Sequence, residues 1–286
     1  MMINGAALAV AASVVMHVTW NLIARHQARD AYPLWWVLLA HLVLLGPWGA
    51  YSLFTDVQWT PTLVKWVLIS ATANVVYFMG LRRAYECAPV AFVYPLVRSS
   101  PVLIALWSTL FLGETLGVFA WTGLLVSVLG LVVLARVGGN AHDIRALPWA
   151  LLAMFATSIY SLTDRAATAH IPGFGGLVGF ITIGYFASWL ALTIDLRRTT
   201  GSWRPKSRIS LPVAVVGGLC VGLAYALVIH AMRSMPAAIV VAFTNAGIVL
   251  ASGASIFVFK ERAAWKARAS AAFIICVGLL MLSFKN

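Results

Sequence analysis

The sequence predicts an all-α integral membrane protein with ten transmembrane helices, arranged as two inverted five-helix repeats around a central cavity. Three observations lead to this prediction: the composition, apolar runs of similar length, and an internal repeat. The chain has 286 residues, of which 62% are hydrophobic and 10% are charged, whereas a soluble domain usually has about 25% charged residues. Composition decides the class, because the length alone would also suit one or two soluble domains.

Apolar runs of about 20 residues recur along the chain, and this is the length that crosses a hydrocarbon core of roughly 30 Å. The connections are short, and the longest polar one is 197–208. The first run ends in WNLIAR rather than at a small-residue cleavage site, so we interpret it as a span and not as a signal peptide. The ten predicted spans are 4–24, 33–54, 64–85, 90–112, 117–136, 147–168, 174–195, 210–231, 236–259 and 267–284.

The basic residues lie mostly in the short loops between these spans, where membrane topology requires them. The net charge of +12 therefore predicts no nucleic-acid partner. Of the 20 Lys and Arg residues, 15 follow odd-numbered spans and four follow even-numbered spans or lie at the C-terminus. Because positive loops stay in the cytoplasm, this distribution predicts that both termini are outside.

An internal repeat relates the two halves, since 84–117 aligns with 231–264. The alignment places Ala84 on Ala231, Pro89 on Pro236 and Glu114 on Glu261. Each half holds five spans, an odd number, so the second half must be inverted relative to the first. The sequence therefore predicts repeats over 1–140 and 141–286, and inverted repeats are typical of transporters. Repetition used only for packing is the alternative.

Both repeats contain Ala-X-X-X-X-Pro followed by an apolar helix that closes in Gly-Glu or Lys-Glu. On these residues the chain resembles the drug/metabolite transporter superfamily, in particular its EamA-type proteins, over essentially its whole length. The resemblance implies ten helices around a central cavity and the transport of a small-molecule substrate through a lipid bilayer. It also implies that both termini are inside, contrary to the charge distribution. We expect a bacterial inner-membrane protein, monomer or homodimer, without a cofactor or metal.

Arg98 is the most informative polar residue, because it lies roughly 10–12 Å along the fourth predicted span. We expect it to contact an anionic group of the substrate, with a salt bridge to Asp164 or Glu86, or snorkelling, as alternatives. Pro95 and Pro101 flank it and are expected to kink the span.

The repeat places Asn245 at the position of Arg98, so it is a second candidate for substrate binding. An interhelical hydrogen bond is the alternative for Asn245. The spacing Gly218-X-X-X-Gly222 predicts a close-packing surface, within the chain or between subunits.

Two helical faces are candidates for substrate and proton contacts. His17, Trp20 and Asn21 share one face of the first span, with His17 as a candidate proton carrier or a neutral packing residue. Tyr160 and Asp164 form the equivalent face of the sixth span. Asp164 is followed by Arg165, which predicts a surface ion pair; if it is buried instead, it suits proton coupling because burial disfavours its charged form.

The remaining candidates for the cavity wall are Asn74, Tyr77, Tyr94 and Tyr225. No phosphate-binding Gly loop, paired carboxylates or metal pattern is recognised, so we expect neither an enzyme nor an ATP-driven pump. The sequence predicts a secondary active transporter of a small anionic or zwitterionic metabolite. A lipid-carrier flippase, an exporter of hydrophobic compounds and a membrane-embedded enzyme are the alternatives.

Overall fold

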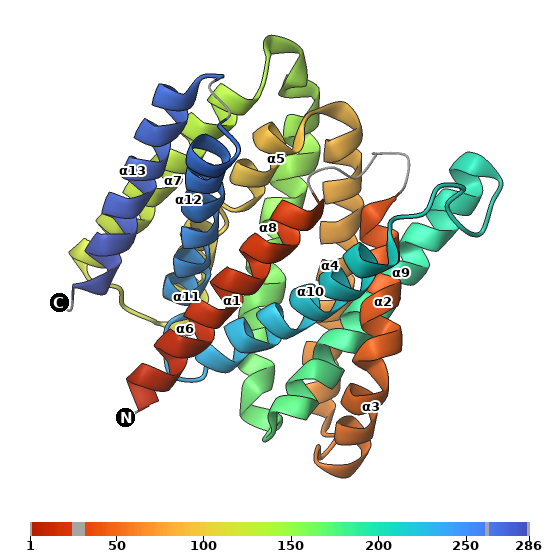
Figure 1. The fold of residues 1–286 in the computed structure, drawn as a ribbon. Helices are drawn as coiled ribbons and strands as arrows, with labels where there is room; N and C mark the ends of the chain where they lie inside the picture. The colour runs from red at the N-terminus through yellow and green to blue at the C-terminus, as the bar shows by residue number, and fades with distance from the viewer. Residues whose placement is uncertain (1, 25–31, 261–262, 285–286) are drawn as a thin grey trace. The chain divides into compact units, whose positions relative to one another are not determined.

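The computed structural model describes residues 2–24, 32–260 and 263–284, and within this part of the chain every regular element is a helix (Figure 1). The helices are α1 (Met2–Ala24), α2 (Pro33–Leu44), α3 (Gly46–Thr55), α4 (Pro61–Cys87), α5 (Val90–Val97), α6 (Pro101–Leu112), α7 (Val118–Gly138), η2 (Ala141–Ala146), α8 (Leu147–Ala167), η3 (Thr168–His170), α9 (Phe174–Thr200), α10 (Leu211–Ala231), α11 (Ala237–Thr244), α12 (Ala246–Gly253), η4 (Ala254–Val258) and α13 (Trp265–Ser283).

Eight helical stretches of the described chain are long and apolar enough to cross a membrane. A ninth candidate is the pair α2 and α3, which is bent by 50°, and α1 contains a shorter apolar helix over Gly5–Trp20. The prediction of an all-helical membrane protein is confirmed, whereas the ten-span inverted layout stays a prediction. The bend after Leu44 was not predicted; a proline in the first turn of α3 has no N–H to continue the hydrogen bonds of α2.

The fourth and ninth predicted spans are each broken near their middle. In the fourth, α5 ends at Val97 and α6 begins at Pro101. Of the two prolines expected to kink this span, Pro101 begins the new helix and Pro95 lies inside α5. In the ninth, the break falls at Asn245, between α11 and α12. Both breaks thus fall at positions that the sequence repeat aligns.

The backbone packs into two compact units. Unit 1 consists of Met1–Met79 and Thr163–Ser234, and unit 2 of Gly80–Leu162 and Met235–Asn286. Each unit therefore combines segments from both halves of the sequence. The predicted boundary near residue 140 concerns the sequence repeat and stays a prediction.

In unit 1, the α2–α3 segment runs antiparallel to α9. Trp35 Nε1 donates to Thr193 Oγ1 at 2.8 Å near one end of this contact. At the other end Gly49 faces Gly179, and a Cβ on Gly49 would lie 2.7 Å from the Gly179 Cα. The two backbones can approach this closely only because both residues are glycine.

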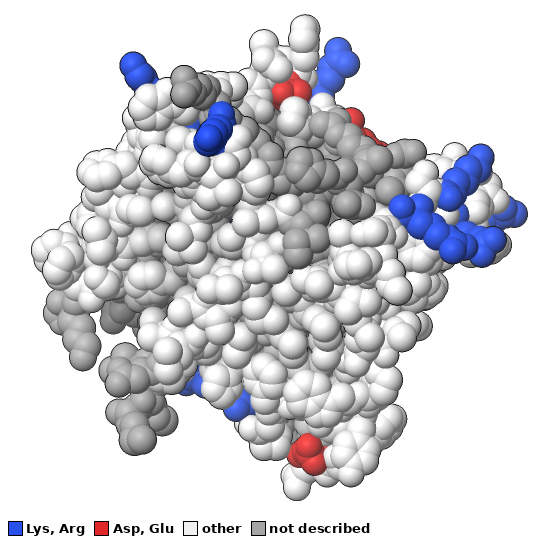
Figure 2. All heavy atoms as spheres, viewed as in Figure 1, with Lys and Arg blue, Asp and Glu red and all other residues white. Residues whose placement is uncertain are grey.

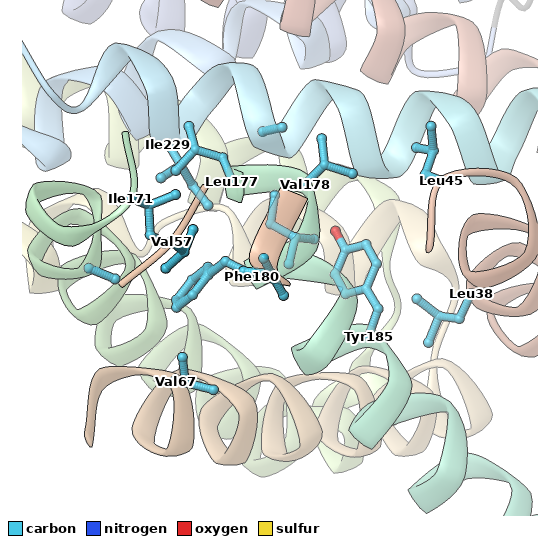
Figure 3. Packing of buried hydrophobic residues seen from close by; sticks show 14 of the residues in the cluster. Leu38, Leu45, Val57, Val67, Ile171, Leu177, Val178, Phe180, Tyr185 and Ile229 are labelled. Carbon is cyan, nitrogen blue, oxygen red and sulfur yellow. The ribbon is translucent and has the colours of Figure 1, made fainter. Parts of the chain in front are cut away.

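The core of unit 1 consists of apolar side chains from α2, α3, α4, α8, α9 and α10 and from the connections between helices. Figure 3 shows Leu38, Leu177 and Ile229 in this core, together with Tyr185. Gly218 lets α10 lie directly against α2, since a Cβ there would be 2.7 Å from the backbone nitrogen of His41. The close-packing surface predicted at this glycine is therefore used within the chain.

In unit 2, α7 packs against α13 through small residues. A Cβ on Gly123 would lie 2.8 Å from the Gly278 carbonyl, and a Cβ on Gly130 would lie 2.8 Å from the Ile275 nitrogen. Earlier residues of α7 thus meet later residues of α13, so the two helices are antiparallel. They are the fifth predicted spans of the two sequence halves.

Candidate functional site

Asp164, near the C-terminal end of α8, is buried and only 1% exposed. Its carboxylate accepts hydrogen bonds from two hydroxyl groups, that of Ser70 on α4 and that of Tyr225 on α10, the second at 2.5 Å. The interpretation of Asp164 as a surface ion pair with Arg165 is therefore wrong, because α4 and α10 cover the carboxylate. All three residues belong to unit 1.

Two opposing effects act on this carboxylate. Burial disfavours its charged form, whereas hydrogen bonds from hydroxyl donors favour that form. Among the residues that the structure describes, the donors to Asp164 are hydroxyl groups and not Lys, Arg or His side chains. Such a carboxyl is suited to taking up and releasing a proton.

Asn74 completes this group by fixing Ser70. Its Nδ2 donates to the Ser70 carbonyl at 3.0 Å and lies 3.4 Å from the Ser70 hydroxyl. Both residues are on the same face of α4, one turn apart. Tyr77 is half-buried and packs edge-on against Phe78, with 4.9 Å between the ring centroids, as part of the unit 1 core. The structure therefore brings Asn74, Asp164 and Tyr225 together and places Tyr77 beside the core.

Of the three residues predicted to share one face of α1, Trp20 packs against neighbouring helices. The Trp20 ring lies against Gly217 of α10, where a Cβ would collide with it, and beside the small cluster of Val37 and Val213. His17 is half-buried. The side chain of Asn21 lies outside the described part of the structure.

Arg98 and Asn245 exchange hydrogen bonds at the two helix breaks of unit 2. Arg98 Nη2 donates to the Thr244 carbonyl at 3.1 Å, and Asn245 Nδ2 donates to the Arg98 carbonyl at 3.1 Å. Each side chain thus satisfies a carbonyl of the opposite break, where regular helical bonding is interrupted. The interhelical hydrogen bond considered for Asn245 is present, and its acceptor is the backbone of the residue to which the repeat aligns it.

Each of these two side chains has a further buried polar atom. Arg98 Nε, a donor, and Asn245 Oδ1, an acceptor, are buried and make no hydrogen bond with any residue that the structure describes. The Arg98 guanidinium also lies over the ring of Tyr94, 5.6 Å from its centroid. Buried polar atoms are usually satisfied by protein or water, so a donor at one break and an acceptor at the other leave capacity for a small polar molecule. Tyr160 is buried on α8.

The salt bridge considered between Arg98 and Glu86 is not formed. Glu86 instead pairs with Arg82 at 3.0 Å and with Arg83 at 3.2 Å on the last turns of α4. Arg98 is thus held by a backbone carbonyl and an aromatic ring.

Two contacts in these sites were missed from the sequence. Ser70 lies one turn before Asn74 on the same face of α4, and this spacing could have indicated it. The Thr244 carbonyl has no sequence signal, because any residue supplies the same acceptor.

A separate cavity of about 490 Å³ opens in unit 1 at the ends of α3, η3 and α10. It is lined by Asp56, Gln58, Thr60, Thr168, Ala169, His170, Ile171, Pro172 and Arg233. Arg233 donates to the carbonyls of Ile171 and Pro172. None of the residues predicted for substrate or proton contacts lines it. Over the described ranges, no three His, Cys, Asp or Glu side chains are grouped as ligands of a metal ion would be.

A comparison with known families gives one match, in the first half of the chain. Residues 4–136 match the family model described as the EamA-like transporter family. The first half of the chain belongs to this family. The resemblance predicted from the repeated motifs is thereby confirmed over residues 4–136, and this match indicates a membrane transporter of the drug/metabolite transporter superfamily.

The fold of this EamA-like protein is shared with a solved structure titled only "Crystal structure of protein". The two chains are 20% identical with a TM-score of 0.75, and the match covers 98% of this chain and 97% of the other. At this identity the likeness concerns the fold alone. No curated protein matches the sequence.

Proposed function

We propose that this EamA-like protein is a secondary active transporter that moves a small anionic or zwitterionic metabolite across a bacterial inner membrane by alternating access. An amino acid, an organic acid or a phospho-compound would fit this description. One observation carries the proposal: a carboxyl buried among membrane helices, Asp164, is held by two hydroxyls. Ionisable groups at such positions are costly, and they typically mark proton or ion pathways.

Asp164 is proposed to couple proton movement to transport. In its charged form it accepts hydrogen bonds from Ser70 and Tyr225, which offset part of the cost of burying the charge. In its protonated form the carboxyl becomes a donor, and a hydroxyl can turn to accept. Both states can therefore be satisfied within the same group of side chains, as a proton carrier requires.

Arg98 and Asn245 are proposed to select the cargo. A guanidinium can donate hydrogen bonds to the oxygens of a carboxylate or phosphate. The buried N–H at Arg98 Nε is available to donate one such bond. The unpaired Oδ1 of Asn245 can accept from an ammonium or hydroxyl group. These two groups favour an anion or a zwitterion and disfavour a purely cationic compound. Trp20, Asn21, Tyr77, Tyr94 and Tyr160 stay candidates for cargo contact.

The packing within each unit supports alternating access. Corresponding spans of the two sequence halves lie antiparallel, α2–α3 with α9 in unit 1 and α7 with α13 in unit 2. This is the relation expected when the second half is inverted, and inverted repeats are the usual basis for exposing one site to either side of the membrane.

Uptake by the purified protein in liposomes tests the proposal. Amino acids, organic acids and phosphonates would be offered one at a time, with and without an imposed pH gradient and with unlabelled cargo inside to detect exchange. We expect at least one anionic or zwitterionic compound to accumulate, faster with the gradient or with internal cargo. Movement of a lipid reporter alone, with no uptake of any soluble compound, would favour the flippase and overturn the proposal.

A further inference from the structure

The connection between α9 and α10 concentrates positive charge. We define the basic loop as residues 197–208, and its cations are Arg197, Arg198, Arg204, Lys206 and Arg208. No acidic residue occurs from 196 to 210. All five cationic side chains are exposed, and Figure 2 shows Lys and Arg gathered over this connection. Five cations in one segment of 12 residues, with no acidic residue in the segment itself, indicate an anionic partner.

The backbone of the basic loop is held in place at several points. Gly201 ends α9 in the left-handed conformation (φ 74°), and its N–H donates to the Arg197 carbonyl at 3.0 Å. Trp36 Nε1 of α2 donates to the Ser207 carbonyl at 3.3 Å, and Pro205 is buried. Because the backbone is already ordered, little entropy is lost when the cations bind a partner.

The basic loop lies at the edge of the apolar surface. The helix α9 has 27 residues and is about 40 Å long at 1.5 Å per residue, so it outreaches a hydrocarbon core of roughly 30 Å. Leu211, the first residue of α10, is a 75% exposed apolar side chain only three positions after Arg208. The cations therefore stand at the level of the lipid headgroups.

Trp203 distinguishes a lipid partner from a soluble anion. Its side chain is 62% exposed, and the Arg197 guanidinium lies over its ring, 5.5 Å from the centroid. Exposed tryptophan is enriched at the membrane–water interface, because the indole is apolar with one polar N–H. A free phosphate ion has no apolar part that could contact this ring, whereas a lipid has acyl chains next to its headgroup.

We propose that the basic loop binds the headgroups of anionic phospholipids and anchors this end of α9 and α10 to an anionic bilayer surface. The arginine side chains would hold lipid phosphates through charge-assisted hydrogen bonds, and Trp203 would sit at the boundary with the acyl chains. This proposal does not rest on the transport function, since binding involves none of the residues proposed for proton or cargo contacts.

Titration of the detergent-solubilised full-length protein with phosphatidylglycerol tests the proposal, with the thermal unfolding midpoint as the readout. The loop variant is Arg204→Gln with Arg208→Gln, and the matched control is Arg145→Gln with Lys266→Gln, exposed cations outside the basic loop. A cation near an anionic surface is worth about fivefold in affinity. We expect the loop variant to need about 25-fold more phosphatidylglycerol for half of the effect and the control to need less than about fivefold more. Equal shifts in the two variants would overturn the proposal.

Three further arms identify the partner. Phosphatidylcholine should have little effect, and 1 M salt should remove the effect of phosphatidylglycerol, because the screening length falls from about 10 Å at 0.1 M to about 3 Å. Trp203→Ala should weaken the response while leaving all five cations in place. Glycerol 3-phosphate carries the headgroup charge without acyl chains, and an equal response to it, or to phosphatidylcholine, would contradict a lipid site.

Discussion

Asp164 in unit 1 and the Arg98–Asn245 pair in unit 2 are polar groups on membrane helices, but they are satisfied in different ways. Asp164 is held by side-chain hydroxyls from α4 and α10, which are continuous helices. Arg98 and Asn245 bond to backbone carbonyls at the points where α5–α6 and α11–α12 are broken. Asp164 makes its hydrogen bonds with side chains, so a change in its charge does not remove a backbone hydrogen bond. A substitution of Arg98 or Asn245 removes a hydrogen bond to a backbone carbonyl at a helix break.

This difference separates two roles. The unit 1 group is suited to carrying a proton, because hydroxyls can reverse their donor and acceptor roles without movement of a helix. The unit 2 pair is suited to binding and bending, because an incoming polar group would compete for side chains that also stabilise the breaks. The variants below are ordered from the largest expected effect to the smallest.

Asp164→Asn tests whether the unit 1 group carries a proton. The amide keeps the shape of the side chain but cannot take up and release a proton, so gradient-driven uptake in liposomes should fall by about a hundredfold or more, as for loss of a positioned proton-transfer group. Asp56→Asn, the same change at an exposed acid, is the control and should transport normally. Full gradient-driven uptake by Asp164→Asn would remove the proposed role.

Arg98→Ala tests whether the unit 2 pair supports both the break and the cargo. It removes a charged donor from the Thr244 carbonyl, so the free energy of unfolding should fall by about 1.5–3 kcal/mol. Uptake of anionic cargo should fall as well, although the protein still inserts. Arg83→Ala, which removes a cation from a surface pair, should cost no more than about 1 kcal/mol. If Arg98→Ala behaves like this control in both assays, Arg98 has neither role.

Tyr225→Phe tests the second hydroxyl donor to Asp164. The ring stays and only the hydroxyl is lost, so we expect a destabilisation of about 0.5–1.5 kcal/mol and slower gradient-driven uptake. Exchange of unlabelled for labelled cargo, measured without a gradient, should be less affected. The matched change at the exposed Tyr51 should alter neither quantity. An equal loss in both transport modes would place Tyr225 with the cargo instead.

The same substitution at two buried serines sharpens the comparison. Ser70→Ala removes a donor from Asp164 and should destabilise the protein by about 0.5–1.5 kcal/mol. Ser100, at the break beside Arg98, has a buried hydroxyl with no hydrogen bond to any described residue, so Ser100→Ala should be neutral or slightly stabilising. The thermal unfolding midpoints of the two variants, compared with that of the unmodified protein, test both expectations. Destabilisation by Ser100→Ala would mean that its hydroxyl is satisfied in the folded protein.

Much of the fold could be predicted because each span is a local property of the sequence. A run such as 118–138 contains enough apolar residues to require burial in lipid, and a helix satisfies its backbone within the run. Pro101 could likewise be expected to interrupt a helix, since it has no N–H. The bend between α2 and α3 was missed, although a proline follows Gly46 directly, because the apolar pattern continues through it.

The site was predicted less well, because its contacts join distant segments. Ser70 and Asp164 are 94 residues apart, and Tyr225 is 61 residues beyond Asp164. The neighbouring Arg165 made a surface ion pair the simpler interpretation of Asp164, and burial overturned it. For Arg98 the alternatives named acidic partners, whereas the structure uses a carbonyl that every residue type possesses.

The sequence by itself determined the membrane class and the approximate positions of most helices, because hydropathy depends only on residues near one another in the chain. It also predicts an inverted relation between the two halves, from the spacing of the repeat. The tertiary structure alone decided which polar groups are buried, which donors they receive and which carbonyls they satisfy. These depend on which helix faces meet, and in a chain whose helices are nearly all apolar, hydropathy does not distinguish one face from another.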